Sequence, residues 1–217
     1  MKIVSIFLTF ILFLFCFNKS FSQTYLNKFS LEGGYGYTGA VYPVYTIKER
    51  ESNYSGFNHF TIGLRYMYDK DFGARLSYAN DRFRNEPGGE FGVNFNRISL
   101  EGIYNVGRLF DLSYRTRDVL GLIGHLGGGY VTSKPMNYPN YERIGSITIG
   151  LTPQVLITKR IALYTDFTYV FNLKQHWRFA GELIDDENYI PVVGQHYNFS
   201  IGFMFYLGPN LWHEDWY

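Results

Sequence analysis

The chain has 217 residues, of which 20% are aromatic and a single one is cysteine. Its 20 Lys and Arg residues nearly balance its 19 Asp and Glu residues, so the charge gives no signal for nucleic-acid binding. One cysteine excludes a framework of intrachain disulfides, and the length suits a single domain. The abundance of Tyr and Phe, with 20 of each, favours β-strands and is typical of the aromatic girdles of membrane barrels.

The N-terminus has the pattern of an export signal. Lys2 provides a short positive start, residues 3–17 are almost wholly apolar, and residues 20–22 place small side chains where a signal peptidase cleaves. The apolar run is shorter than the roughly 20 residues that a spanning helix needs. The pattern predicts a cleaved signal peptide over residues 1–22, which would also remove Cys16.

The rest of the chain is dominated by alternating segments. In residues 197–207 the odd positions are all large and apolar, whereas the even positions are mixed, which is the period of a β-strand. A tilted strand of about ten residues is long enough to cross a bilayer. Seven more segments show the same alternation, and the eight predicted strands are 28–37, 58–68, 72–83, 95–106, 119–132, 146–157, 161–172 and 197–207.

Closed barrels satisfy every backbone hydrogen bond in a membrane without helices. The sequence therefore predicts an all-β fold, an eight-stranded antiparallel up-and-down transmembrane β-barrel in the cell outer membrane. The connections 69–71 and 158–160 are tight turns, 107–118 has room for a short helix, and the other loops are long and polar. Short turns of such barrels face the periplasm, so we expect both termini there, with the barrel over residues 23–208 and a periplasmic tail over 209–217.

Two local features predict irregular strands. Pro153 lies inside a predicted strand, where it cannot donate a ladder hydrogen bond, so we expect a bulge or a bend. The run Gly127-Gly128-Gly129 predicts a kink or a close approach of the neighbouring backbone.

The inner face of the predicted barrel carries charge. An Arg or Lys facing lipid at the midplane would cost about 2–4 kcal/mol, whereas inward charges can pair across the bore. Eight strands leave an interior that side chains just fill, which favours a structural plug over a narrow or gated pore. The predicted lumen charge network comprises Glu32, Arg65, Arg75, Arg97, Glu101, His125, Asp166 and His196.

Catalysis is the third interpretation of this inner face. A lipid A-modifying enzyme or a barrel protease needs a nucleophile beside a base. Ser200 follows His196 by four residues on the same strand face, roughly 13 Å along the axis, which is too far for a hydrogen bond. The five His residues show no spacing typical of a metal site. We therefore expect no enzyme activity, no catalytic residues, no metal and no cofactor.

A basic and aromatic cluster lies in the last long loop. Lys174, His176, Trp177, Arg178 and Phe179 could contact lipopolysaccharide phosphates or a partner. The commoner interpretation is an aromatic girdle with ordinary loop charges.

Several short motifs resemble the N-terminal barrel of OmpA-like proteins of the Bacteroidota. The resemblance covers nearly the whole mature chain, and the motifs that carry it are residues 63–68 with 72–73, 97–102, 105–108, 150–154, and 205–208 with 213–217. It implies an eight-stranded porin-like barrel with no catalytic residues to transfer. The periplasmic peptidoglycan-binding domain of that family does not fit into the residues after the last strand, so wall tethering is not expected.

The last strand and the tail suggest two kinds of partner. Ser200, Gly202, Phe205 and Leu207 resemble the signal read by the barrel-assembly machinery, although an amphipathic strand can match so short a pattern by chance. Three aromatic residues in the tail suit a docking anchor for an envelope protein, namely Trp212, Trp216 and Tyr217.

The function expected from the sequence is a structural or interaction role without catalysis. Its partners would be outer-membrane lipid and lipopolysaccharide, the barrel-assembly machinery and an envelope protein. A small passive channel and an accessory subunit of an envelope complex remain as alternatives.

Overall fold

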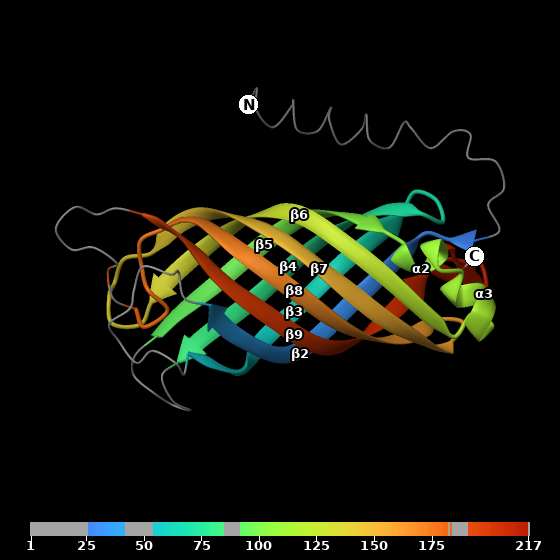
Figure 1. Ribbon diagram of the computed structural model, residues 1–217, viewed down its shortest axis with the longest axis horizontal. Helices are drawn as coiled ribbons and strands as arrows, with labels where there is room; N and C mark the ends of the chain where they lie inside the picture. The colour runs from blue at the N-terminus through green and yellow to red at the C-terminus, as the bar shows by residue number, and fades with distance from the viewer. Residues whose placement is uncertain (1–25, 42–53, 85–91, 182, 184–190, 217) are drawn as a thin grey trace, which may run out of the picture.

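The computed structural model describes residues 26–41, 54–84, 92–181, 183 and 191–216, and the predicted signal peptide lies outside them. Eight antiparallel strands form a closed barrel in chain order (Figure 1). They are β2 (Phe29–Val41), β3 (Ser55–Met67), β4 (Phe72–Arg84), β5 (Gly92–Tyr104), β6 (Leu120–Pro135), β7 (Glu142–Thr158), β8 (Ile161–Gln175) and β9 (Val192–Leu207). Strand β9 closes the barrel by pairing with β2, for example through Leu31 and Phe205.

Five short elements complete the described chain. Strand β1 (Leu26–Asn27) pairs in parallel with β10 (Trp212–His213), and the 3₁₀ turn η1 (Glu214–Trp216) follows directly. Helices α2 (Val106–Leu109) and α3 (Leu112–Thr116) connect β5 to β6, where the sequence leaves room for a short helix.

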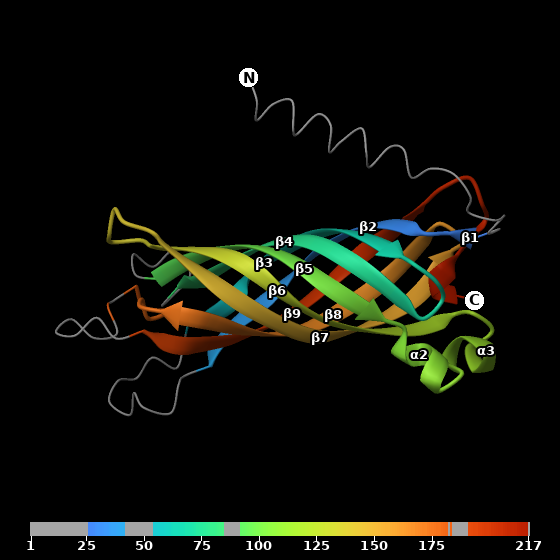
Figure 2. The same ribbon diagram turned by 90° about the horizontal axis from the view of Figure 1, so that it is seen from above.

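The two ends of the barrel differ. We call the end with the turns 68–71 and 159–160 the turn end; it also carries α2, α3 and both ends of the described chain (Figure 1). The opposite end is the loop end. Figure 2 shows that α2 and α3 stand to the side of the barrel wall rather than beneath its opening.

All eight predicted strands are confirmed, and their limits agree best at the turn end. There each strand ends within two residues of its predicted limit, whereas at the loop end each strand is one to five residues longer. The strands extend past the zone that faces lipid, and there their outward side chains need not be apolar. The hydrogen-bonded pairing therefore continues where the alternation of apolar and polar residues has ended. Strand β9, for example, begins at Val192 instead of residue 197.

The alternation separates an apolar exterior from a polar interior. Exposed large apolar side chains cover the outward face of every barrel strand, among them Leu31, Leu64, Leu100 and Phe203. The inward positions between them are buried and mainly polar or charged. None of the helices in the described part of the chain has the length and hydropathy to span a membrane.

The two irregularities predicted from Pro153 and the glycine run have different outcomes. The β7–β8 pairing keeps one register on both sides of Pro153 and shifts only between Leu156 and Thr158, beside the turn. The register therefore contains no bulge at Pro153, although Thr152 and Pro153 have no paired partner on β8. The alternative, a bend, stays a prediction. The close approach is confirmed at Gly127, where a Cβ would lie 2.3 Å from the carbonyl oxygen of Leu100.

Candidate functional site in the barrel lumen

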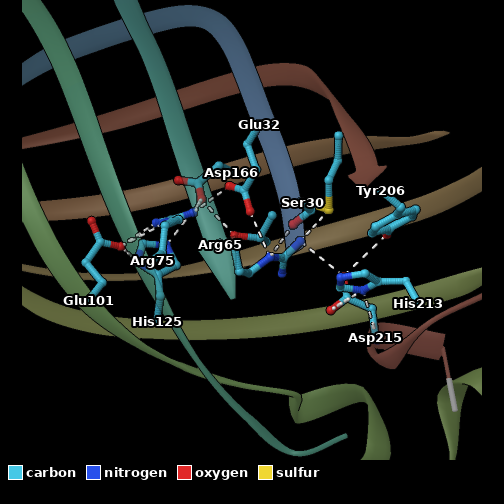
Figure 3. A network of polar contacts seen from close by, with 12 residues as sticks. Ser30, Glu32, Arg65, Arg75, Glu101, His125, Asp166, Tyr206, His213 and Asp215 are labelled. Carbon is cyan, nitrogen blue, oxygen red and sulfur yellow. Dashed lines mark hydrogen bonds and ion pairs between the residues drawn. The ribbon is translucent and has the colours of Figure 1, made fainter. Parts of the chain in front are cut away.

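Six of the predicted lumen charges form one group, which we call the central charge cluster (Figure 3). Its members are Glu32, Arg65, Arg75, Glu101, His125 and Asp166. Arg75 lies 2.5 Å from a carboxylate oxygen of Glu101, 3.3 Å from Glu32 and 3.6 Å from Asp166. Arg65 lies 2.8 Å from Glu32, so strands β2 to β5 and β8 are joined by charge across the bore.

His125 lies between two carboxylates of this cluster. Its Nδ1 lies 2.9 Å from Glu101 and its Nε2 lies 3.2 Å from Asp166. Neither ring nitrogen has a hydrogen-bond partner among the described residues, so the contacts rest on distance alone. A carboxylate beside each nitrogen would attract the charged imidazolium, in which both nitrogens carry a proton. Gly150 on the neighbouring strand leaves the space for the ring, because a Cβ there would lie 2.4 Å from His125 Nε2.

Two predicted charges lie in a second group, the histidine cluster, which comprises His59, Asp81, Arg97 and His196. The buried carboxylate of Asp81 lies 2.5 Å from His59, 3.1 Å from Arg97 and 3.4 Å from His196. The eight predicted residues therefore form two groups instead of one network. His59 was not among the predicted lumen residues, although it shares the parity of Arg65 on β3 and the alternation alone places it inside.

The space between the two clusters is small. A cavity of about 20 Å³ is lined by members of both, including Arg75 and Arg97. That volume holds about one water molecule. The charged middle of the barrel is therefore filled by side chains that neutralise one another.

The loop end is closed by apolar side chains, which we call the loop-end plug: Phe83, Val93, Phe95, Val131, Ile144 and Phe179. Phe179 comes from the segment after β8 and is 3% exposed. Its ring centroid lies 4.5 Å from that of Phe83 and 5.8 Å from that of Phe95.

This position of Phe179 corrects one sequence interpretation. Residues 174–179 do not form a surface cluster, because both aromatic residues of the segment are buried. The other buried aromatic residue, Trp177, packs against Tyr138 with ring centroids 4.6 Å apart. Apolar rings are stabilised in the mouth of the barrel, where they leave water, more than on an exposed loop.

The turn end is closed by the tail. Trp216 is 2% exposed and donates a hydrogen bond from Nε1 to Tyr206 Oη at 2.9 Å. It packs with Tyr206 and Met204 of β9 in a buried apolar cluster. We call residues His213–Trp216 the tail plug. Trp216 is therefore not available to a docking partner in this conformation; Trp212 is half-buried, and Tyr217 lies outside the described residues.

Asp215 links the tail plug to the central charge cluster (Figure 3). Its Oδ2 lies 3.1 Å from Arg65 Nη2, and its backbone oxygen accepts a 3.0 Å hydrogen bond from Asn105. Burial by itself raises the pKa of Asp215, but the charges of Arg65 and His213 outweigh it and hold the pKa below its usual range. The carboxylate is therefore ionised and holds the tail in the barrel.

The residues of the predicted assembly signal occupy the expected faces of β9. Ser200 is buried in the lumen and Gly202 lies on the same face, whereas Phe205 and Leu207 are exposed on the outside. Recognition by the assembly machinery stays a prediction.

The two residues considered for catalysis, Ser200 and His196, do not form a nucleophile paired with a base. Ser200 Oγ has no hydrogen-bond partner among the described residues. His196 is held by Asp81 and Arg97, and its ring stacks on Phe95. Nothing in this contact set orients His196 towards a hydroxyl group.

No known protein-family profile matches the sequence, and no curated protein is significantly similar to it. Several solved structures are similar in fold, among them the following two. Neisserial surface protein A (NspA) is 13% identical, with a TM-score of 0.54 over 82% of this chain and 97% of that protein. A major outer membrane protein from Thermus thermophilus is 12% identical, with a TM-score of 0.54 over 83% of this chain and 99% of that protein. The closed barrel, its apolar exterior and these likenesses give this chain the fold and the membrane location of a small eight-stranded outer-membrane β-barrel.

Proposed function

We propose that this protein is a non-enzymatic outer-membrane barrel with a closed lumen, which has a structural or interaction role in the envelope. The proposal rests on the successive groups of side chains that block the lumen along the barrel axis. The loop-end plug, the two charge clusters and the tail plug follow one another through the described part of the lumen.

The charged barrier is the hardest to remove. Arg75 faces three buried carboxylates, so moving Arg75 would leave these carboxylates short of positive charge. Breaking a buried ion pair in this way typically costs about 3–5 kcal/mol. A gate built from these residues would open rarely, which supports a plug over a passive channel.

The orientation and the processing of the chain are part of the same proposal. The turn end faces the periplasm, residues 1–22 are removed on export, residues 23–208 form the barrel and residues 209–217 form its tail. Ser200, Gly202, Phe205 and Leu207 serve as the assembly signal. The motif resemblance supports a relationship to OmpA-like barrels of the Bacteroidota.

Planar-bilayer recording tests the closed lumen. Protein whose folding is verified by a heat-modifiable shift on a gel should give no steps in conductance at high protein load. A variant without residues 209–217 that is still folded should also be silent, because the two charge clusters and the loop-end plug remain. Regular conductance steps from the folded wild-type protein would overturn the closed lumen and favour the passive channel. Retention of a stoichiometric partner during purification from native membranes would identify an interaction role.

A further inference from the structure

The connection between β5 and β6 exposes three large apolar side chains at the turn end. Tyr114 is 87% exposed, Leu109 is 64% exposed and Phe110 is 62% exposed. All three belong to residues 106–116, which we call the helical foot. Several large apolar side chains exposed within one short segment are a candidate interaction site.

Two polar contacts join the helical foot to neighbouring segments of the barrel. Arg108 Nε lies 2.7 Å from Asp71 Oδ1 of the neighbouring turn. Thr116 Oγ1 accepts a hydrogen bond of 3.0 Å from the backbone N–H of Leu120, at the start of β6. The foot lies beside the barrel wall at the turn end (Figure 2).

A groove of about 230 Å³ lies between the foot and the outside of the barrel. Leu112 of α3 lines it together with outward apolar residues of β6, β7 and β8, including Leu120, Val155 and Leu163. The groove opens to the lipid-facing exterior at Leu120 and Val155, which are exposed on that surface. A single acyl chain matches its apolar lining.

Basic side chains follow directly, along the chain, the segments that line the groove. Arg115 and Arg117 are exposed at the end of α3, and the exposed pair Lys159 and Arg160 forms the turn between β7 and β8. Asp111 and Asp118 are the acidic residues of the foot and its junction, so the local charge is positive. Basic side chains beside buried apolar ones are typical of surfaces that bind anionic lipid.

We propose that the helical foot and its groove bind an anionic phospholipid of the inner leaflet. One acyl chain lies in the groove beside Leu112, the exposed rings enter the boundary between headgroups and acyl chains, and Arg115 and Arg117 contact the phosphate. This inference uses the orientation in the proposed function, with the turn end in the periplasm, but it does not depend on a closed lumen.

Native mass spectrometry of the detergent-purified full-length barrel tests the site. Phosphatidylglycerol should bind at least fivefold more tightly than phosphatidylcholine with the same acyl chains. The variant Arg115→Gln/Arg117→Gln should bring this ratio close to one, since each arginine near an anionic lipid contributes about fivefold in affinity. The matched control Arg82→Gln/Arg143→Gln removes two exposed charges nearer the loop end and should keep the ratio.

The groove has its own test. Leu112→Gln should weaken binding of both lipids without changing their ratio, and millimolar inorganic phosphate should not displace phosphatidylglycerol. Equal binding of the two lipids to the wild-type protein, or an unchanged ratio in the double-arginine variant, would overturn the proposal. Displacement by phosphate would reduce the site to a free-anion site and also overturn it. A conducting lumen would contradict the proposed function and leave these results standing.

Discussion

Asp215 Oδ2 lies 3.1 Å from Arg65 Nη2, so the last described turn of the chain is joined by charge to strand β3 in the barrel wall. The same Arg65 lies 2.8 Å from Glu32 on β2. The contact makes the tail part of the lumen instead of an appendage.

Replacing this carboxylate tests the link. Asp215→Asn should lower the free energy of unfolding by about 1–3 kcal/mol, because Arg65 loses one charged partner but keeps Glu32. Urea titration in lipid vesicles, followed by tryptophan fluorescence, measures the change. Asp111→Asn, an exposed carboxylate on the foot, is the control and should stay within about 0.5 kcal/mol of wild type. Equal stability of both variants would contradict the link.

The contribution of Asp215 should depend on pH in a defined direction. Its folded pKa lies below the ordinary value of 3.8, so its stabilisation is fully present above that value and is lost as the pH falls through the folded pKa. The stability difference between wild type and Asp215→Asn should therefore be constant at neutral pH and shrink below about pH 4. Repeating the urea titrations across that range measures it, and a difference that grows on acidification would refute the assignment.

Gly150 tests the packing around His125. Gly150→Ala should destabilise the barrel by about 1–3 kcal/mol, because the new Cβ would lie 2.3 Å from the carbonyl oxygen of Phe167 and 2.4 Å from His125 Nε2. Gly33→Ala is the matched control, since no heavy atom lies within 4 Å of its Cβ position. The temperature at which the heat-modifiable band shifts reports both variants. If the two behave alike, His125 is not confined as described.

The loop-end plug depends on Phe179. Phe179→Ala should cost about 3 kcal/mol, because the ring is buried against Phe83 and Phe95. Met136→Ala on the exposed hairpin of the same end should cost less than about 1 kcal/mol. Limited proteolysis of the segment after β8, together with urea titration, distinguishes the two. A Phe179→Ala barrel as stable and as protease-resistant as wild type would argue against the plug.

The sequence by itself determined the strands and their faces. The period of a strand is local, so Phe205 and Leu207 could be placed outside and Ser200 inside without knowing any contact. The same alternation assigned Arg75 and Glu101 to the lumen, and a charged side chain had to face inward because lipid excludes it.

Only the tertiary structure decided which inward groups meet. Arg75 contacts Asp166 four strands along the chain, whereas Arg97 belongs with Asp81 in the histidine cluster. These partners depend on the stagger of strands around a closed barrel, which no local pattern encodes. The positions of Phe179 and Trp216 were likewise decided by the space at the two ends of the lumen, where both side chains are buried. In the sequence, an aromatic residue in a polar segment is equally compatible with an exposed loop. Only the closed barrel provides the cavity that removes the ring from water.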